Sequence, residues 1–176
     1  MLKAVGELLI ESGPAAVTVD AVIARSGAAR ATIYRHWPTR DALVLAGMSC
    51  LMPPPRPPDL EGLTTEAALS ALVAGFCAQL EREPWAGALP ALLDQARRRP
   101  ELAARMQEFL DERKKPVRDV LAAGVRAGEL RADLALDAGV SQVLGPLFFR
   151  RAVTAEPLDA AFQVAVLTGF LRGHRP

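Results

Sequence analysis

The residues best suited to chemistry in this chain lie between Gly27 and Leu43, in the stretch GAARATIYRHWPTRDAL. Cationic, hydroxyl and aromatic side chains surround the apolar Ile33 and Trp37 there: Arg30, Thr32, Tyr34, Arg35, His36 and Arg40. On a short helix, such side chains bind phosphate oxygens and reach base edges in the major groove of a duplex. The stretch therefore indicates recognition of double-stranded DNA.

Total charge supports this interpretation less than local charge does. The formal net charge is only +1, whereas nucleic-acid-binding domains are usually strongly basic. Residues 21–40, however, contain no acid and hold several groups that are or can become cationic: Arg25, Arg30, Arg35, His36 and Arg40. A local positive patch is therefore predicted, with an ordinary solvated face as the alternative.

A support helix and a helix-turn-helix are predicted to position this stretch. A helix from about Leu2 to Ser12 is ended by Gly13-Pro14. Thr18 is of the type that caps helices, and it precedes a short helix over Val19 to Ser26. Gly27 permits the left-handed turn that ends this helix and redirects the chain into the recognition helix.

A change of composition after a fourth helix predicts two domains. Thr39 is expected to cap that linking helix, which runs to about Met52. The segment PPPRPP, residues 53–58, cannot continue a helix and favours an extended connector, with a proline-rich ligand for another protein as the alternative. We therefore predict a helix-turn-helix DNA-binding domain at residues 1–52, and a second helical domain at residues 53–176.

The composition predicts an all-α fold. Apolar residues make up 51% of the chain, and β-branched residues do not gather into alternating runs. After the proline-rich segment, helical spacing predicts five helices: from Thr64 or Thr65 to Glu83, Trp85–Arg98, Pro100–Gly128 with a bend at Pro116, Asp137–Val153 and Pro157–Arg172.

The last two predicted helices are apolar on more than one face, which requires burial on several sides. A small monomer has too little protein to cover both of them. We therefore predict that the pair meets its symmetry mate in a four-helix dimer interface, a central helix pair in a compact monomer being the alternative. The predicted interface residues are Val140, Val143, Leu144, Leu147, Phe148, Leu158, Phe162, Val166 and Phe170.

The N-terminal pattern resembles that of the TetR family of transcriptional regulators from Leu2 to Val44, in LKAVGELL, SG, TVDAV, a second SG and TIYRHWPTRDALV. The segments PELAARMQ, AGVRAGELR and LGPLFFRRAVTAEPLD resemble, more loosely, the regulatory domain of one branch of that family. The resemblance implies a homodimer whose two heads bind half-sites of a palindromic operator. It also implies a C-terminal ligand-binding and dimerisation domain, in which a small effector binds and causes release of the DNA.

The resemblance assigns roles within the head. Thr18 and Tyr34 would hydrogen-bond phosphates, and Arg40 would contact the DNA backbone. The groove-facing positions are Arg30, Ala31, Thr32, Arg35 and His36, and the predicted DNA-binding surface also includes Arg25 and Ala29. Arg30 would read sequence, because arginine reaches both acceptors of a guanine, worth ~1 to 3 kcal/mol of discrimination. The two apolar residues of the stretch are expected to pack inward.

Two of the chain's departures from the family pattern bear directly on DNA binding. Ala28-Ala29 stands where many members have Val-Ser, so the hydroxyl that caps the recognition helix and contacts phosphate is missing. The chain also opens directly on its first helix, without the basic arm that many members carry. A restored basic arm is expected to tighten DNA binding and to steepen its salt dependence.

A stripe of apolar residues is expected to form the core of the second domain, and the resemblance adds a cavity for an effector. The predicted lining residues are Phe76, Cys77, Leu80, Trp85, Leu89, Leu92, Met106, Phe109, Leu110 and Gln142. Core alone and core plus cavity both remain open on the residues themselves. The effector would be apolar or a flat aromatic, held by a polar group such as Gln79, Gln107 or Gln142. Cys77 is interpreted as a small buried apolar residue, a thiol sensor being the alternative.

Other classes of function find little support. The sequence has no Gly-rich phosphate loop, G-x-S-x-G elbow or H-E-x-x-H motif, so neither catalysis nor a metal or cofactor site is expected. Two distant cysteines, no signal-peptide pattern and no apolar run of ~18 to 20 residues favour a soluble cytoplasmic protein without a membrane partner. The leading hypothesis is a dimeric, effector-released repressor. The alternative is a helical small-molecule carrier or protein-interaction module that no longer reads DNA.

Overall fold

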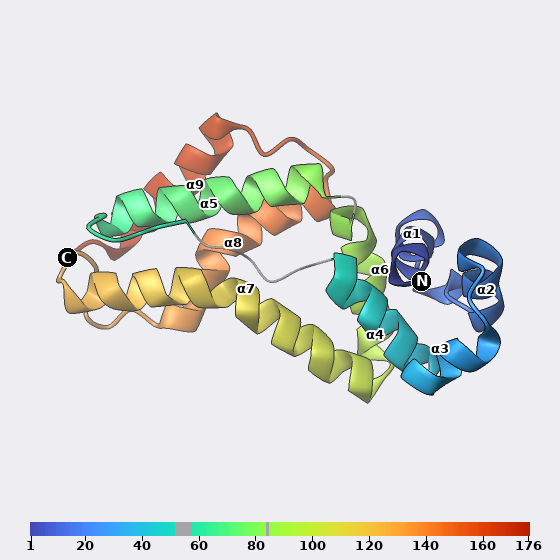
Figure 1. Ribbon diagram of the computed structural model, residues 1–176. Coiled ribbons are helices and arrows are strands. Elements are labelled where there is room, and N and C mark those ends of the chain that lie inside the picture. Colours follow the sequence, from blue (N-terminus) through green and yellow to red (C-terminus); the bar gives the residue numbers. More distant parts are fainter. Residues whose placement is uncertain (52–57, 84) are drawn as a thin grey trace. The chain divides into compact units, whose positions relative to one another are not determined.

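The computed structural model describes residues 1–51, 58–83 and 85–176, apart from the side chains of Trp85, Ala88 and Glu101. All regular structure in these ranges is helical (Figure 1), which confirms the predicted all-α fold. The expected proline-rich connector lies largely outside the described residues, and so does the predicted domain boundary at residues 52–53. None of the described helices is both long and apolar enough to cross a membrane.

The chain divides into two compact units. The first consists of Met1–Pro54 and Pro84–Phe109, and the second of Pro55–Glu83 and Leu110–Pro176. Residues 84–109, which the sequence analysis places in the second domain, thus pack in the first unit. They do so because α6 (Trp85–Arg97) contacts α1 (Leu2–Ser12).

The first unit is built around the packing of α1 on α4. Its elements are α1, the 3-10 turn η1 (Pro14–Ala16), α2 (Val19–Ser26), α3 (Arg30–His36), α4 (Arg40–Leu51), α6 and the first part of α7 (Pro100–Arg126). Gly47 of α4 faces α1 so closely that an added Cβ would overlap Val5 and lie 3.2 Å from Leu9. This approach seals Val5 and Leu9 completely from solvent. At the end of α1, Gly13 adopts φ 75°, so the helix ends where the sequence predicts.

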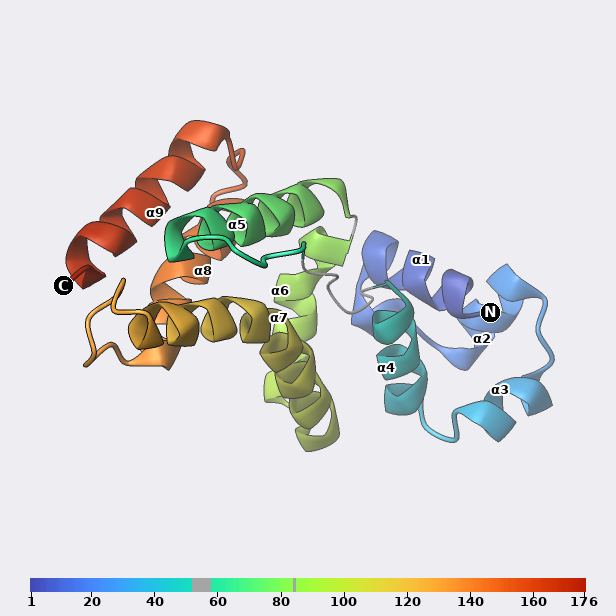
Figure 2. The same cartoon turned by 60° about the vertical axis from the view of Figure 1, so that its left-hand side comes forward.

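The second unit places three helices against one another. Its elements are α5 (Thr65–Arg82), the remainder of α7, α8 (Leu136–Ala152) and α9 (Ala160–His174), and α5, α8 and α9 pack together (Figures 1 and 2). α5 begins where predicted, because the Thr64 hydroxyl oxygen accepts a hydrogen bond from the Ala67 N–H at 3.3 Å. α9 begins three residues later than predicted, because the Asp159 carboxylate caps it by accepting from the Phe162 N–H at 2.8 Å.

Candidate nucleic-acid interface

α2 and α3 form a helix-turn-helix as the sequence predicts. The Thr18 hydroxyl oxygen accepts a hydrogen bond from the Ala21 N–H at 3.1 Å and so caps α2. This bond uses an oxygen lone pair and leaves the hydroxyl proton available for a phosphate oxygen. At the other end of α2, Gly27 adopts φ 68° and its N–H donates to the Ile23 carbonyl at 2.9 Å. A residue with a side chain would be strained there, which explains the glycine.

α3 directs its polar side chains outward because one apolar residue anchors it. Ile33 is completely buried, and Trp37, directly after the helix, is half-buried. The side chains on the outer face are exposed: Arg30, Ala31, Tyr34, Arg35 and His36. Thr32 is half-buried. The helix therefore presents a row of donors outward, which is the arrangement that reading a major groove requires.

α3 begins without a side-chain cap, as its sequence predicts. Ala29 occupies the N-cap position in extended conformation and provides no side-chain hydrogen bond. At the preceding turn the Ser26 hydroxyl donates to the Val22 carbonyl at 2.6 Å and accepts from the Ala28 N–H at 3.3 Å, which leaves the first N–H groups of α3 uncapped. The first N–H groups of α3 thus depend on other acceptors, water or bound anions.

Arg25, one of the residues predicted to contact DNA, is engaged with two acids of the head. Its guanidinium pairs with Glu11 at 2.7 Å and lies 3.9 Å from Glu7, so it ties α2 to α1. The two acids are one helical turn apart on α1, a spacing that places both on one face. Both acids lie outside the acid-free residues 21–40. Arg25 thus contributes to the packing of the head, and its phosphate contact stays a prediction.

Arg40, another residue predicted to contact DNA, is engaged with backbone carbonyls of the head. Its Nε donates to the Val17 carbonyl at 2.7 Å and its Nη2 donates to the Pro14 carbonyl, so the half-buried guanidinium holds the connection between α1 and α2. These two bonds use two of the five N–H donors of Arg40, so a contact between this side chain and the DNA backbone stays a prediction. Thr39 caps α4 as predicted, by accepting from the Ala42 N–H at 3.1 Å.

Two acids of this unit form ion pairs that the sequence analysis did not predict. Asp20, in the first turn of α2, pairs with Arg30, and it stands one residue before the acid-free segment. Asp41, in the first turn of α4, pairs with Arg99. The positive patch is therefore partly neutralised, and Arg35 and His36 carry its exposed outer end.

The residues predicted to line an effector cavity are distributed over both units. In the first unit Leu89, Leu92 and Met106 are buried and Phe109 is half-buried; in the second Cys77 and Leu80 are buried and Phe76 and Leu110 are half-buried. The Trp85 side chain lies outside the description. The cavity as a whole thus stays a prediction. Gln142 differs from expectation, because it is exposed and its Oε1 is hydrogen-bonded to Nε2 of His174 at 2.7 Å.

A buried cation on α7 was not anticipated. Arg113 is only 8% exposed and stands four residues from both Phe109 and Val117, in the core register of the helix. Burial lowers the pKa of its guanidinium to about 10, with Glu112 acting in the opposite direction. The group therefore remains charged at neutral pH inside the domain.

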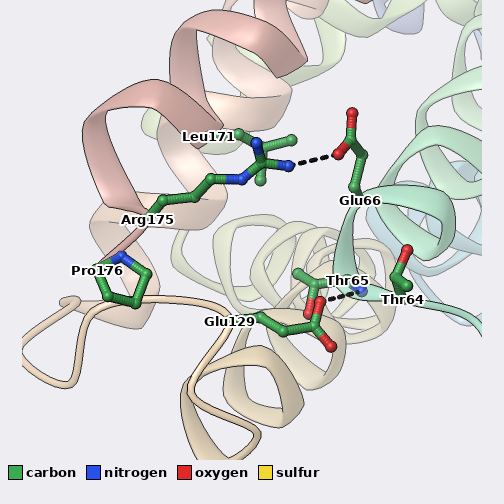
Figure 3. A pocket seen from close by; sticks show the side chains of 7 residues that line it. All are labelled: Thr64, Thr65, Glu66, Glu129, Leu171, Arg175 and Pro176. Atoms are coloured by element: carbon green, nitrogen blue, oxygen red, sulfur yellow. Dashed lines mark hydrogen bonds and ion pairs between the residues drawn. The ribbon is translucent and has the colours of Figure 1, made fainter.

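The structure contains an open pocket of ≈ 420 Å³ at the start of α5 (Figure 3). Its lining consists of Thr64, Thr65, Glu66, Glu129, Leu171, Arg175 and Pro176. The Glu129 carboxylate accepts from the Thr65 N–H at 2.9 Å, and Glu66 pairs with Arg175 at 2.5 Å. The charged groups of this pocket are thus engaged with the protein itself, and none of the predicted effector residues lies in its wall.

The predicted dimer residues divide between the core and the surface of the second unit. Val140, Val143, Leu147, Leu158 and Phe170 are buried within the chain, so their side chains complete its own core and are not available to a second subunit. Leu144, Phe148, Phe162 and Val166 are half-buried. Large apolar side chains are exposed beside them at Phe149, Val153 and Val164.

A helix-turn-helix whose second helix exposes arginine, tyrosine and histidine over one buried anchor defines a class of protein, the DNA-binding regulators. The family follows from comparison with known sequences. The family "Bacterial regulatory proteins, tetR family" matches residues 2–46, and the family "Tetracyclin repressor-like, C-terminal domain" matches residues 57–168. The chain belongs to the TetR family of bacterial transcriptional regulators, as its sequence motifs indicated, and it is a DNA-binding regulator of transcription.

Individual relatives agree with this assignment. The chain is 32% identical over 152 residues to the uncharacterized HTH-type transcriptional regulator Rv1556 of Mycobacterium tuberculosis (strain ATCC 25618 / H37Rv), covering 85% of this chain and 73% of Rv1556. It is 26% identical over 168 residues to the uncharacterized HTH-type transcriptional regulator YdeS of Bacillus subtilis (strain 168), covering 92% of this chain and 81% of YdeS. The crystal structure of the TetR family transcription regulator SCO0332 is similar with a TM-score of 0.66 and 29% identity, over 99% of this chain and 96% of that one.

Proposed function

We propose that the protein is a homodimeric repressor that binds a palindromic operator through two α3 helices and is released by a small apolar or aromatic effector. The observation that carries the proposal is the outward face of α3, where Arg30, Tyr34 and Arg35 are exposed over the buried Ile33. The match of residues 57–168 to a tetracycline-repressor-like domain supports the regulatory half of the proposal.

DNA recognition divides into positioning and reading. Thr18 caps α2 with its oxygen and offers its hydroxyl proton to a phosphate, and the exposed Tyr34 hydroxyl offers a second such bond. Arg30 reads a base edge, because its planar guanidinium fits both major-groove acceptors of a guanine. Arg35 and His36 extend the surface along the groove.

A second copy of the chain covers the apolar side chains that α8 and α9 leave exposed. Phe149, Val153 and Val164 are 56%, 65% and 63% exposed, which is unusual for large apolar residues on neighbouring helices. A two-fold axis beside these helices buries the same residues of both copies in one four-helix interface. Two heads on one dimer then require an operator with two-fold symmetry.

The effector acts through a coupling free energy between its own site and the DNA-binding heads. Such coupling is reciprocal, so an effector that weakens DNA binding must itself bind less tightly to the DNA-bound dimer by the same factor, typically reflecting ~1 to 3 kcal/mol. Within the second unit, the buried Cys77 and Leu80 are apolar groups of the kind that lines such a site, which suits an apolar ligand.

The test is selection of binding sites from a random pool of duplex DNA, at low and then at physiological salt. Enrichment of a palindrome, with half-sites about one or more helical turns apart, is the expected result. Arg30→Ala and Tyr34→Phe should both weaken binding to the selected site. A folded dimer that enriches no sequence at either salt concentration would refute the proposal.

A further inference from the structure

The exposed ion pair between Asp20 and Arg30 joins the two helices of the helix-turn-helix. The bond runs from Nη2 of Arg30, the first residue of α3, to Oδ1 of Asp20 in the first turn of α2. The side chains are 55% and 76% exposed, so both lie on the outer surface of the head. The acid is thus in direct contact with the residue that the proposed function assigns to base reading.

The pair contributes little to folding. Exposed ion pairs typically stabilise proteins by ~0 to 1 kcal/mol, because solvent screens the charges and two long side chains lose freedom. Its larger effect is on where the Arg30 side chain points. A free arginine samples many rotamers, and the negative potential of the phosphate backbone favours those that bring its charge close to a phosphate.

The geometry of the guanidinium allows it to hold an acid and a base at the same time. Arginine carries five N–H donors in a planar fork, and the bond to Asp20 runs through Nη2. Donors therefore remain for the two acceptors that a guanine presents in the major groove. A guanidinium already fixed by a carboxylate loses less freedom when it forms these bonds.

The neighbourhood of Asp20 gives the pair a second consequence. Asp20 stands two residues after Thr18, whose hydroxyl is proposed to bind a phosphate. A carboxylate near a phosphate is repelled unless a cation neutralises it. Arg25, the arginine of α2 itself, is already paired with Glu11 of α1. Arg30 is thus the cation that neutralises Asp20 near the DNA. If Arg30 rotated to the phosphates, the Asp20 carboxylate would lose its partner and would repel the DNA.

We propose that Asp20 is a positioning residue that determines sequence specificity, by holding Arg30 toward the base edges and away from the phosphate backbone. This inference rests on the proposed reading of DNA by α3. Loss of the carboxylate frees Arg30 to bind phosphates, so binding to random DNA strengthens while binding to the operator does not. Discrimination falls although a negative charge has been removed from a DNA-binding surface.

The test compares Asp20→Asn with Glu66→Gln in the full-length protein. Glu66 is also an acid in the first turn of a helix and also pairs with an arginine, Arg175, but it lies in the second unit. The control thus also removes one negative charge from the first turn of a helix and one ion pair with an arginine, but it does so away from the helix-turn-helix. Dissociation constants are measured for the selected operator and for a random duplex, each over a range of salt concentrations.

Asp20→Asn should lower the ratio of random-duplex to operator dissociation constants by about tenfold, the size of one bidentate base contact. It should also steepen the salt dependence of random binding by about one phosphate contact per head. Glu66→Gln should change neither quantity. In an Arg30→Ala background, Asp20→Asn should no longer lower the ratio, because the acid acts through Arg30; a purely structural role would give the same change in both backgrounds.

Three outcomes separate the possible failures. If the ratio and the salt slope of Asp20→Asn equal those of the wild type while Arg30→Ala still loses discrimination, the inference is overturned and the reading role of Arg30 stands. If Asp20→Asn lowers the ratio of random-duplex to operator dissociation constants equally with and without Arg30, Asp20 does not act by positioning Arg30, and the inference is overturned. If the wild type itself does not discriminate between the two duplexes, the proposed function fails and the inference fails with it.

Discussion

The Asp41 carboxylate and the Arg99 guanidinium form an ion pair that ties the first turn of α4 to the residue directly before α7. Both side chains are only about a third exposed, at 27% and 36%, so solvent screens this pair less than most pairs of the molecule. α7 starts in the first unit and continues into the second as one helix. The pair therefore fixes the head to the beginning of the element that both units share.

A double-mutant cycle with Asp41→Asn and Arg99→Gln should reveal this bond in the free energy of unfolding. We expect a coupling energy of about 1 kcal/mol, at the upper end of the range for solvent-exposed pairs. Arg98→Gln is the matched control, because Arg98 belongs to the same run of arginines but pairs with Asp94 at 3.5 Å with both side chains largely exposed. Urea unfolding of the four variants measures the cycle. Equal effects of Arg99→Gln in the presence and absence of Asp41 would contradict it.

Arg40 and Arg35 should give opposite results when each is replaced by methionine. Arg40→Met removes the guanidinium donor from the Val17 carbonyl and one of the two donors from the Pro14 carbonyl, which keeps its bond from the Val17 N–H, so the free energy of unfolding should fall by about 1 to 3 kcal/mol. Arg35 is exposed on α3, so Arg35→Met should leave stability within about 0.5 kcal/mol of the wild type and weaken DNA binding. Denaturant unfolding and DNA titration on the same samples distinguish them. A stable Arg40→Met protein with a pure DNA-binding defect would restore Arg40 to the interface.

These arginines show what the sequence could and could not predict. Local signals located the elements of the head, because the cap at Thr18, the left-handed Gly27 and the buried Ile33 depend on near neighbours in the chain. The partners of Arg25 and Arg40 lie on other elements, and which of several arginines meets an acid or a carbonyl depends on how those elements pack.

The C-terminal helices illustrate the same limit. Apolar residues on several faces of α8 and α9 predicted helices that are covered on several sides. Periodicity could not say which face is covered by the chain itself, as Val143 and Leu147 are, and which remains for a partner, as at Phe149 and Val164. α9 also starts late, because a cap by Asp159 outweighs the apolar pattern that extends back to Pro157.

Gly47 should not tolerate alanine. A Cβ at this position would overlap the Val5 side chain of α1, so the packing of α1 on α4 would have to shift. We expect Gly47→Ala to reduce the free energy of unfolding by about 1 to 3 kcal/mol despite the better helix propensity of alanine. Gly75→Ala on α5 is the control, because that glycine is exposed, has open space around it, and should gain roughly 0.5 to 1 kcal/mol. Thermal unfolding that shows both variants stabilised would disprove the close contact of α1 and α4.

Charge on the exposed apolar residues of α8 and α9 should separate the proposed dimer. In Phe149→Lys and Val164→Lys, a lysine would have to be buried against its symmetry mate, whereas the free subunit exposes it to water. Sedimentation at micromolar concentration should show monomers for both variants and a dimer for the wild type. Ala91→Lys, at an exposed position of α6 in the first unit, should remain dimeric. Dimers in all three variants would place the interface elsewhere.

Cys77 should behave as a buried apolar group whose protonation stabilises the fold. Burial, assisted by the nearby Glu81, raises the pKa of its thiol from 9.0 to about 11. A raised pKa means that the stabilisation is fully present below about pH 9, where the thiol is protonated in both states, and is lost as the pH rises through about 11. The difference in free energy of unfolding between the wild type and Cys77→Ala should therefore shrink by about 2 kcal/mol over this window.

The same shift makes Cys77 a poor thiol sensor, because the thiolate is the reactive species. At pH 8 a thiol reagent should modify the exposed Cys50 quickly and Cys77 only on unfolding. The Cys50→Ala variant isolates the second reaction, and oxidant treatment of that variant should leave DNA binding unchanged. Rapid modification of Cys77 in the folded Cys50→Ala protein, or loss of DNA binding on oxidation, would show that the thiol is accessible. Either result would support the alternative that Cys77 is a thiol sensor.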